Sequence, residues 1–350
     1  MAEAAAAVEV FDREMLLVPL EDPTKCPHAK EWDGITFAEW QAKNIKSKEV
    51  ITLLNFLLWT IFTVTAEEIS YFWWLYYLRQ GHGYTVLSDI RGGAQQDKVE
   101  GGLMQVCERL VDQIGADNVK LRAPVREILQ KGDGHVEVVT SSAGTFHGSY
   151  VIVTAPPSVC EDIYFSPPLS AERQQLHKLF RAGTVIKVYV CYQNWWWRER
   201  GWSGEMLSDE EPVTLYYDAT TEKVPAFIGF IPAHHAKKWG NVSSDELKQA
   251  IIKQLVREFG PDAASPLEVL IRPWLPDDVW CKGAYAGSMG KNVLSKYGHV
   301  LRVPSGNIHW AGTELALDWC GYFEGAVESG ERAALEVQKK LAVKGQAAKL

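Results

Sequence analysis

The stretch AGTELALDWCGYFEGAVESGERAA, residues 311–334, constrains the fold of this chain more than any other part of its sequence. The residues NIHWAG (307–312) that lead into it are typical of a short buried strand, and those after the turn are typical of a helix. Two glycines, Gly325 and Gly330, lie inside that helix, where each costs roughly 1 kcal/mol relative to alanine. A helix that keeps both glycines needs its backbone to lie close to a partner.

The small residues of this helix, predicted over 322–341, fall on one stripe. They recur at i, i+4, i+7 and i+8, as Ala326, Gly330, Ala333 and Ala334. Such a stripe admits another backbone or a flat cofactor, and a helix N-terminus at the carboxyl edge of a sheet favours a negatively charged ligand. The residues alone leave two interpretations open. The helix packs tightly on a sheet without a ligand, or it contacts a cofactor.

The rest of the chain alternates between helical and extended patterns. A helix is expected around Phe37–Lys46, a helical and very aromatic segment over 51–80, and an amphipathic helix over 245–260, ended by glycine and proline. A β-meander with a turn at 131–134 feeds a buried strand near 151–155. Further strands are expected at 183–193, 213–218 and 226–231. The apolar run 51–66 is too short and too rich in Thr to span a membrane, which favours a buried helix.

Composition narrows the class of protein. A chain of 350 residues is long enough for two domains, and its net charge of −8 without any basic run argues against a nucleic-acid surface. Its six scattered cysteines, without a CxxC pair, predict reduced thiols in an intracellular protein. The N-terminal residues lack the features of a secretory signal. The final Ala348-Lys349-Leu350 is a variant of the Ser-Lys-Leu address, so we expect a peroxisomal location, with the cytoplasm as the alternative.

The C-terminal stretch resembles the signature of the flavin-containing amine oxidases, most closely the monoamine oxidase branch. In that branch a strand ending in Ala-Gly-Thr-Glu is followed by Trp-x-Gly-Tyr-x-Glu-Gly-Ala and Gly-Glu-Arg-Ala-Ala, which WAGTE and WCGYFEGAVESGERAA match almost residue for residue. The similarity runs from about residue 30 to 340. Polyamine oxidases and L-amino-acid oxidases end differently after the Ala-Gly turn. The resemblance implies a mixed α/β fold of the FAD-linked amine oxidase type.

Catalytic roles follow from the resemblance where positions match. Lys187 corresponds to the lysine that holds a water against the flavin. Without the resemblance, Lys187 could be a surface lysine on an edge strand. Its neighbours in the sequence are Val and Ile, however, which suggests a buried ammonium that needs a partner. Tyr285 and Tyr322 correspond to the two tyrosines that flank the substrate amine, where facing rings orient its lone pair. Without the resemblance, either tyrosine could belong to the core.

Other positions are implied in cofactor and substrate binding. Gln95 corresponds to a residue of the substrate cavity. The expected contacts to the cofactor, FAD, come from Val125, Gly312, Thr313, Glu314, Tyr322 and Phe323. No metal ligand is expected.

Two features depart from the family pattern. Animal mitochondrial monoamine oxidases attach the flavin through a Cys just before the first cage tyrosine, and here that residue is Ala284, so non-covalent FAD is expected; Cys281 is a poor substitute. The sequence also contains no GxGxxG, the motif that seats the FAD diphosphate in this family. We therefore expect a truncated fold that lacks most of the nucleotide-binding half, with a dimer or partner chain as a source of that half.

The expected domains follow the same resemblance. A discontinuous antiparallel-sheet domain for substrate is expected over 1–97 and 161–299, the rest of a Rossmann-like FAD domain over 98–160 and 300–342, and a tail over 343–350.

The sequence is compatible with three functions. The first is FAD-dependent oxidative deamination of a primary or secondary amine to an imine and aldehyde, with O₂ reduced to H₂O₂ (an EC 1.4.3-like enzyme). The second is a non-catalytic truncated homologue that acts as a binding or regulatory protein. The third is a metal-dependent or hydrolytic enzyme, which has little support because His234-His235 is the sole His pair and no HExxH or GxSxG occurs. The sequence favours the oxidase.

Overall fold

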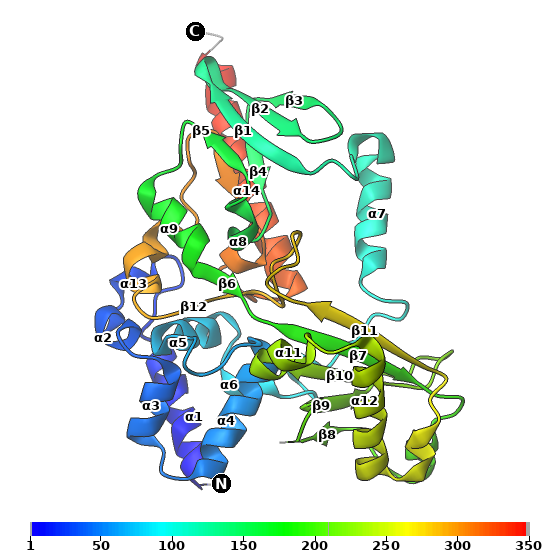
Figure 1. The fold of residues 1–350 in the computed structure, drawn as a ribbon. Helices are drawn as coiled ribbons and strands as arrows, with labels where there is room; N and C mark the ends of the chain where they lie inside the picture. The colour runs from blue at the N-terminus through cyan, green and yellow to red at the C-terminus, as the bar shows by residue number, and fades with distance from the viewer. Residues whose placement is uncertain (1, 209, 348–350) are drawn as a thin grey trace. The chain divides into compact units, whose positions relative to one another are not determined.

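The chain forms two compact units, each built from segments far apart in the sequence (Figure 1). The computed structural model describes residues 2–208 and 210–347. Unit 1 comprises Met1–Ala4, Thr36–Ile69 and Arg181–Ser288, and unit 2 comprises Ala5–Ile35, Ser70–Phe180 and Met289–Leu350. These units are groups of residues that contact one another, whereas the domains predicted from the sequence are a substrate domain and an FAD domain. The two divisions describe different properties, so the predicted domain boundaries stay a prediction. The C-terminal tripeptide on which the localisation rests lies outside the described residues.

Unit 1 is organised around a five-stranded antiparallel sheet of order β11-β7-β10-β9-β8. The predicted strands at 183–193, 213–218 and 226–231 all lie in it, which confirms an antiparallel sheet in this part of the chain. The strands are β7 (Val185–Cys191), β8 (Met206–Leu207), β9 (Leu215–Asp218), β10 (Ala226–Pro232) and β11 (Glu268–Trp274). The helices of this unit are α3 (Phe37–Asn44), α4 (Lys48–Ile61), α10 (Trp196–Glu199), α11 (Ala233–Trp239) and α12 (Ser244–Phe259).

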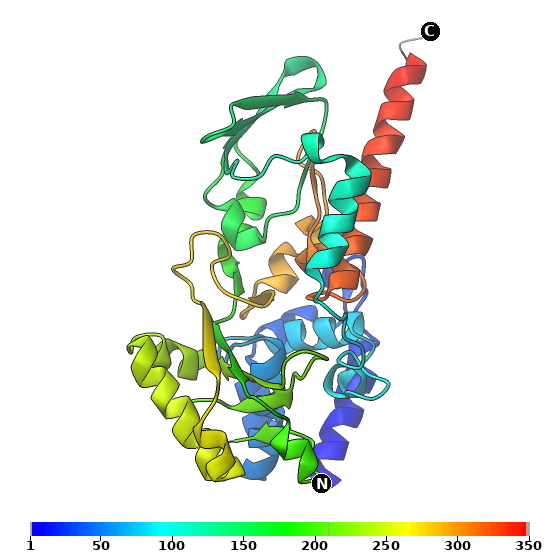
Figure 2. The same cartoon turned by 90° about the vertical axis from the view of Figure 1, so that its right-hand side faces the viewer.

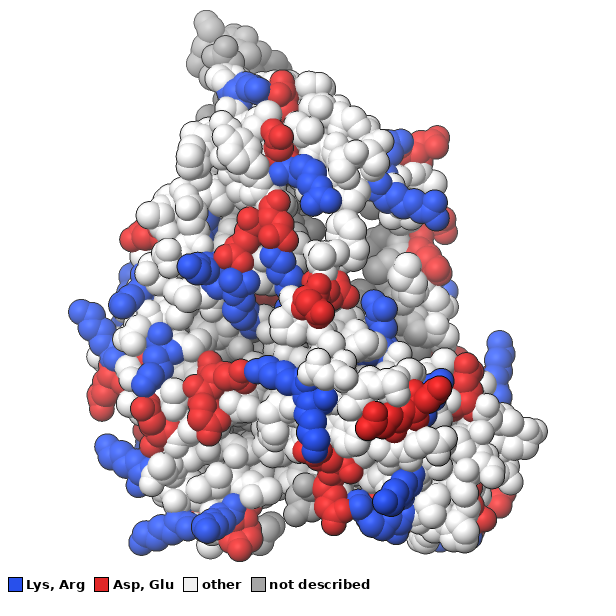
Figure 3. Space-filling model, viewed as in Figure 1, with Lys and Arg blue, Asp and Glu red and all other residues white. Residues whose placement is uncertain are grey.

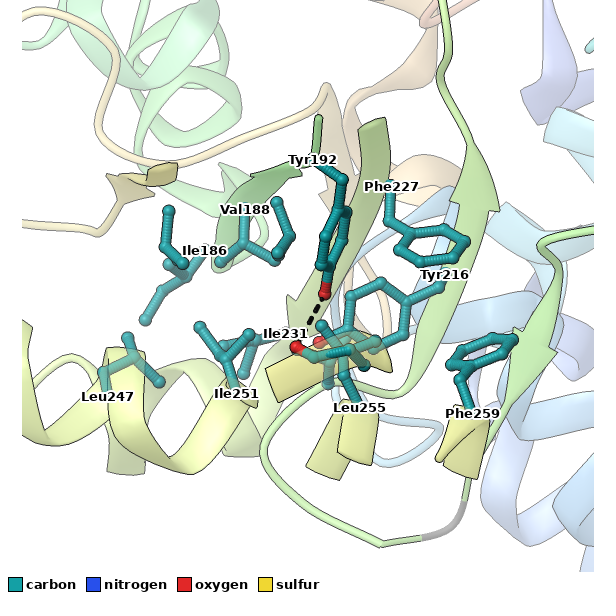
Figure 4. Close-up of a cluster of buried hydrophobic side chains, with 14 of the residues drawn as sticks. Ile186, Val188, Tyr192, Tyr216, Phe227, Ile231, Leu247, Ile251, Leu255 and Phe259 are labelled. Carbon is teal, nitrogen blue, oxygen red and sulfur yellow. Dashed lines mark hydrogen bonds between the residues drawn. The ribbon is translucent and has the colours of Figure 1, made fainter. Parts of the chain in front are cut away.

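The core of unit 1 lies between the sheet and α12 (Figure 4). Ile186 and Val188 on β7 meet Ile251 and Leu255 on α12, because both elements place apolar residues on the facing side. The Tyr192 hydroxyl reaches into this core and donates to a backbone carbonyl at 3.1 Å, so its polar atom is satisfied. One face of the sheet is therefore filled by α12, which leaves the other face for a different role.

The segment over 51–80, expected to be helical and aromatic, is helical for most of its length and is divided between two helices. α4 ends at Ile61, Thr63 takes a positive φ of 56°, and the Ser70 side chain caps the next helix, α5 (Tyr71–Gln80). The two helices also differ in environment. α4 buries one stripe and leaves Leu53 43% exposed, whereas nine of the ten residues of α5 are buried. The segment thus contains an amphipathic helix, α4, followed by a core helix, α5.

The surface bears charge of both signs. On the face drawn in Figure 3, lysine and arginine side chains are interspersed with aspartate and glutamate, as expected from a net charge of −8 without basic runs. Among the described residues, no helix is long and apolar enough to cross a membrane.

Unit 2 contains the predicted β-meander. β1, β2 and β3 pair antiparallel, and β5 adds parallel to β1, giving the order β3-β2-β1-β5. The next strand, β4, leaves this sheet and pairs in parallel with β13. The strands are β1 (Val125–Lys131), β2 (His135–Thr140), β3 (Thr145–Gly148), β4 (Val151–Val153), β5 (Tyr164–Ser166) and β13 (Ile308–Trp310). Two further strands, β6 (Phe180–Ala182) and β12 (Gly287–Met289), pair with each other, and each has residues in both units.

The remaining helices complete unit 2. Apart from α5 they are α1 (Ala2–Met15, which begins in unit 1), α2 (Ala29–Asp33), α6 (Tyr84–Ser88), α7 (Met104–Ile114), α8 (Pro157–Cys160), α9 (Ala171–Leu179), α13 (Leu294–Tyr297) and α14 (Phe323–Ala347). β13 is fully buried, as predicted. α14 follows it after a loop and runs as one long rod (Figure 2).

The two glycines of α14 have different surroundings. A Cβ added at Gly325 would lie 2.2 Å from the Trp319 carbonyl oxygen, so this position requires glycine because the backbone of the preceding loop lies against it. A Cβ added at Gly330 would meet nothing within 4 Å. The close approach expected from the sequence is therefore present at the first glycine. In the stripe of small residues around Gly330, Ala326 is exposed and Gly330 has free space beside it, while Ala333 is buried.

This contrast gives a matched pair of variants. Gly325→Ala is expected to destabilise unit 2 by roughly 1–3 kcal/mol, because the new methyl overlaps a backbone oxygen that cannot move freely. Gly330→Ala is expected to stabilise the chain by about 1 kcal/mol, because alanine has the higher helix propensity and open space here. Urea unfolding of each variant, followed by circular dichroism, gives the midpoints that measure both changes in stability. Equal midpoints for the two variants would contradict this account of α14.

Candidate active site

The face of the unit 1 sheet opposite α12 gathers aromatic side chains around Lys187. Because side chains alternate along β7, Ile186 and Val188 point into the core and Lys187 and Tyr189 lie on the opposite face. Phe230 of β10 lies directly across the ladder from Lys187. The Lys187 Nζ is 5.4 Å from the centre of the Tyr189 ring and 5.8 Å from that of Phe230, within cation–π range.

This geometry corrects one expectation from the sequence. Lys187 is only half-buried, and the Val and Ile residues beside it in the sequence face the other way. Its ammonium group lies against aromatic rings, which solvate a cation in part without neutralising it.

Tyr285 belongs to the same aromatic group in unit 1. Its ring meets Phe230 edge to face, with the ring centres 6.1 Å apart. The side chain is 40% exposed as a whole. Burial of its hydroxyl end, together with nearby Tyr217, nevertheless raises the pKa of Tyr285 above the usual range. The phenol therefore stays protonated at neutral pH and acts as a neutral ring rather than as a base.

The loop that carries Tyr285 is held by backbone contacts within unit 1. The Ala284 amide donates to the Gly183 carbonyl at 3.0 Å, and the Thr63 hydroxyl donates to the Ala284 carbonyl. Ala284 itself is buried and presents only a methyl group. Cys281, three residues earlier, is half-buried, and burial raises the pKa of its thiol, which lowers the thiolate fraction.

In unit 2, the loop after β13 is fixed by its own hydroxyl groups. The Gly312 amide donates to Ser329 Oγ at 3.0 Å, which ties the loop to α14. Thr313 Oγ1 accepts from the Gly321 amide at 2.7 Å and donates to the Tyr322 carbonyl at 2.8 Å. Gly312 has a φ of 112°, and a Cβ there would lie 3.1 Å from a neighbouring carbonyl oxygen, so this turn favours glycine.

The structure brings Tyr322 and Gln95 together, two residues that the sequence predicted for the substrate pocket. Gln95 Nε2 lies 3.4 Å from the Tyr322 hydroxyl, a long hydrogen bond that orients the phenol. The Trp319 ring meets the Tyr322 ring edge to face at 5.4 Å. Burial raises the pKa of Tyr322, and the hydrogen bond from Gln95 opposes that shift in part.

The predicted cofactor contacts of unit 2 lie in two places. Glu314 is buried in the loop, and Phe323 is 42% exposed at the start of α14, where the first amides of the helix have no partner within the helix. Val125 begins β1 and pairs with Thr140 in the other sheet. The exposed start of α14 leaves its first amides available to a ligand. The sequence supplies no matching diphosphate loop.

Sequence reasoning missed Arg302, which positions this loop. Its guanidinium donates to the Leu315 carbonyl at 2.8 Å, to the Ala316 carbonyl at 2.7 Å and to the Tyr76 hydroxyl at 2.8 Å. Gln80 of α5 donates to the same Ala316 carbonyl at 2.7 Å. An arginine between Leu301 and Val303 was the available signal, since a cation in an apolar run needs acceptors.

Unit 2 also contains a cavity of about 650 Å³, which is not part of the candidate site. Its walls include Gln130, Pro168, Arg173 and Gly306, and none of the predicted site residues, all of which are described, lines it. Arg173 donates to the carbonyls of Leu301 and Val303 at 3.1 and 3.0 Å, so its guanidinium is already occupied.

Comparisons with known proteins agree on one family. The family described as flavin containing amine oxidoreductase matches residues 17–338. A probable flavin-containing monoamine oxidase A of Dictyostelium discoideum is 36% identical over 315 residues, which are 89% of this chain and 69% of that protein. The flavin-containing amine oxidase B of Canis lupus familiaris is 35% identical over 325 residues, 91% of this chain and 62% of that protein. The chain thus spans about two thirds of the length of these relatives.

Solved structures agree on the fold. A cyclohexylamine oxidase from Brevibacterium oxydans superposes with a TM-score of 0.92 at 31% identity, over 98% of this chain and 76% of that one. A putrescine oxidase bound to putrescine superposes with a TM-score of 0.90 at 27% identity, over 97% of this chain and 75% of that one. Both confirm the mixed α/β fold expected from the sequence.

Proposed function

Because the chain belongs to the flavin-containing amine oxidoreductase family, we propose that it takes part in the FAD-dependent oxidation of a primary or secondary amine, as its monoamine oxidase relatives are named for doing. The net reaction converts amine, O₂ and water to an aldehyde, H₂O₂ and ammonia or a smaller amine. A bound flavin would supply the acceptor for the two electrons that leave with the α-hydrogen. The observation that carries the proposal is the aromatic face of unit 1, where Lys187 and Tyr285 both pack against Phe230.

The side chains of this face are suited to an uncharged amine. Neutral phenol and phenyl rings attract the amine nitrogen and exclude water without supplying a counter-charge. We propose that Tyr285 contacts the amine and orients its lone pair, and that Gln95 fixes the hydroxyl of Tyr322, the other tyrosine that the resemblance implies in substrate binding. Since burial raises the pKa of both tyrosines, neither takes a proton from the substrate at neutral pH.

Lys187 is assigned a different role in this proposal. Its ammonium lies on the aromatic face at a fixed position, where it holds a water molecule or a developing negative charge during oxidation. The residues proposed to hold the flavin are Val125, Gly312, Thr313, Glu314, Tyr322 and Phe323. The test of the function is amine-dependent H₂O₂ formation by flavin-loaded protein. Flavin-loaded protein that forms none with any amine would favour a binding or regulatory role.

We propose that the flavin is held without a covalent bond. Ala284 has no thiol, and Cys281 is three residues away with a raised pKa. Acid precipitation is therefore expected to release all flavin into the supernatant, and Cys281→Ser should not change that result. The matched variant Ala284→Cys restores the residue found in the animal mitochondrial enzymes and is expected to retain flavin in the pellet. Flavin in the pellet of the unaltered protein would contradict the proposal.

A further inference from the structure

The hairpin of β2 and β3 places two histidines and a glutamate on one face of the unit 2 sheet. His135 and Glu137 are two positions apart on β2 and so point to the same side, while Val136 between them is fully buried on the other. His147 of β3 lies directly across the ladder from Glu137. The alternation and the register together bring these three side chains to one solvent-accessible spot.

The distances within this group suit a single metal ion. His135 Nε2 and His147 Nδ1 are 3.2 Å apart, and the two rings are stacked with an interplanar angle of 18°. Two nitrogens at about 2.0–2.1 Å from a tetrahedral zinc ion are about 3.3 Å apart, so the histidines already have the spacing of two ligands. The ligand atoms of all three residues lie within 4.8 Å of one another, so a rotation of the glutamate side chain completes the set. The described residues contain no other such group of three.

The ligand chemistry favours a transition metal such as zinc. Two imidazoles and one carboxylate are the donors of zinc sites with three protein ligands, in which water takes the fourth position. Calcium and magnesium are excluded because both require oxygen ligands. We propose that His135, Glu137 and His147 form a Zn²⁺ site that clamps β2 to β3.

One neighbour competes with the ion for the carboxylate. Lys131 Nζ lies 3.1 Å from Glu137 Oε2, in an exposed ion pair. Zn²⁺ takes the place of Lys131 or uses the other carboxylate oxygen. Removal of the lysine charge should therefore tighten binding, whereas removal of a ligand should weaken it.

Titration of the full chain with ZnCl₂, followed by calorimetry, tests the site. We expect His147→Ala or Glu137→Gln to weaken binding at one site by about tenfold or more, since each removes one of three ligands. Lys131→Met is expected to bind Zn²⁺ about two- to fivefold more tightly, because the ion no longer competes with an exposed ion pair, whose contribution is small. Zn²⁺ should also raise the melting temperature of the unaltered chain and not that of His147→Ala. The substituted side chains are accessible to solvent, and circular dichroism verifies that each variant is folded.

A matched control separates this site from other zinc binding. His299 also lies beside a glutamate, with Nε2 3.4 Å from Glu172 Oε2, but the described residues offer it no third ligand, so His299→Ala should leave binding unchanged. Replacement of Zn²⁺ by Co²⁺ should give a visible spectrum without the charge-transfer band of thiolate ligands, which excludes the free cysteines. Equal Zn²⁺ affinity and stoichiometry in the unaltered chain and in His147→Ala would overturn the proposal.

Discussion

Lys187→Met is expected to lower the rate of amine-dependent O₂ consumption by about a hundredfold. Removal of one group that stabilises a charge developing during the reaction typically has an effect of this size. Methionine matches the length of the lysine stem and keeps contact with the Tyr189 and Phe230 rings, so the sheet should remain folded. Only the ammonium is removed, and with it the water that it is proposed to hold. Stopped-flow measurement of O₂ consumption with flavin-loaded protein gives the rate.

A neighbouring cation provides the control for this variant. Arg272 of β11 lies directly across the ladder from Lys187, on the same side of the sheet, and its guanidinium is 5.7 Å from the centre of the Trp274 ring. Arg272→Met removes one positive charge from the same surface and should leave the rate nearly unchanged. Lys187→Arg should recover part of the rate. A Lys187→Met rate equal to that of the unaltered protein would remove Lys187 from the mechanism.

The 350-residue chain by itself is expected to purify with little flavin. Its sequence contains no GxGxxG, so the amides that would bind the FAD diphosphate are not supplied by such a loop. Each charge-assisted hydrogen bond contributes about 1.5–3 kcal/mol, and about 1.4 kcal/mol is tenfold in affinity. The loss of two such bonds therefore weakens FAD binding by roughly 10²–10⁴-fold. The flavin-to-protein ratio after purification measures this directly.

A fused or co-expressed strand–GxGxxG–helix segment is expected to restore flavin binding. The open stripe at Ala326 and Gly330 on α14 offers the close backbone contact that such a segment needs. The matched control is the same segment with its three glycines replaced by alanine, which should fail to restore flavin. Stoichiometric flavin in the 350-residue chain alone would show that other residues of this chain bind the diphosphate.

Local pattern was enough to predict three of the five strands of the unit 1 sheet, but not the two-residue β8 or β11. β7, β9 and β10 show apolar alternation or runs bounded by turn residues, and they were found. β11 reads EVLIRPW, and Pro273 argues against a strand. Proline is tolerated there because β11 is the edge strand of the sheet and pairs only with β7. Its position in the sheet, which the sequence does not state, decides whether the proline is allowed.

The candidate site was predictable only through the family resemblance. Single tyrosines such as Tyr285 and Tyr322 carry no signal of their own, because an aromatic residue in an apolar run is usually core. The groups that position them were not predicted, since the contacts of Arg302 with Leu315 and Ala316 depend on the tertiary fold. The His135, Glu137 and His147 group was missed for the same reason, since only the β2–β3 register brings it together.

The most direct test of the proposed function is the visible spectrum of the flavin-loaded protein, with the GxGxxG segment supplied if the chain alone lacks flavin. Under anaerobic conditions, addition of a primary or secondary amine is expected to bleach the flavin absorbance, and admission of O₂ should restore it with equimolar H₂O₂. Tyr285→Ala should bleach far more slowly, because the amine loses the ring that is proposed to orient its lone pair. Protein that binds flavin stoichiometrically and is not bleached by any amine of a broad panel would contradict the assignment of this chain as an amine oxidase.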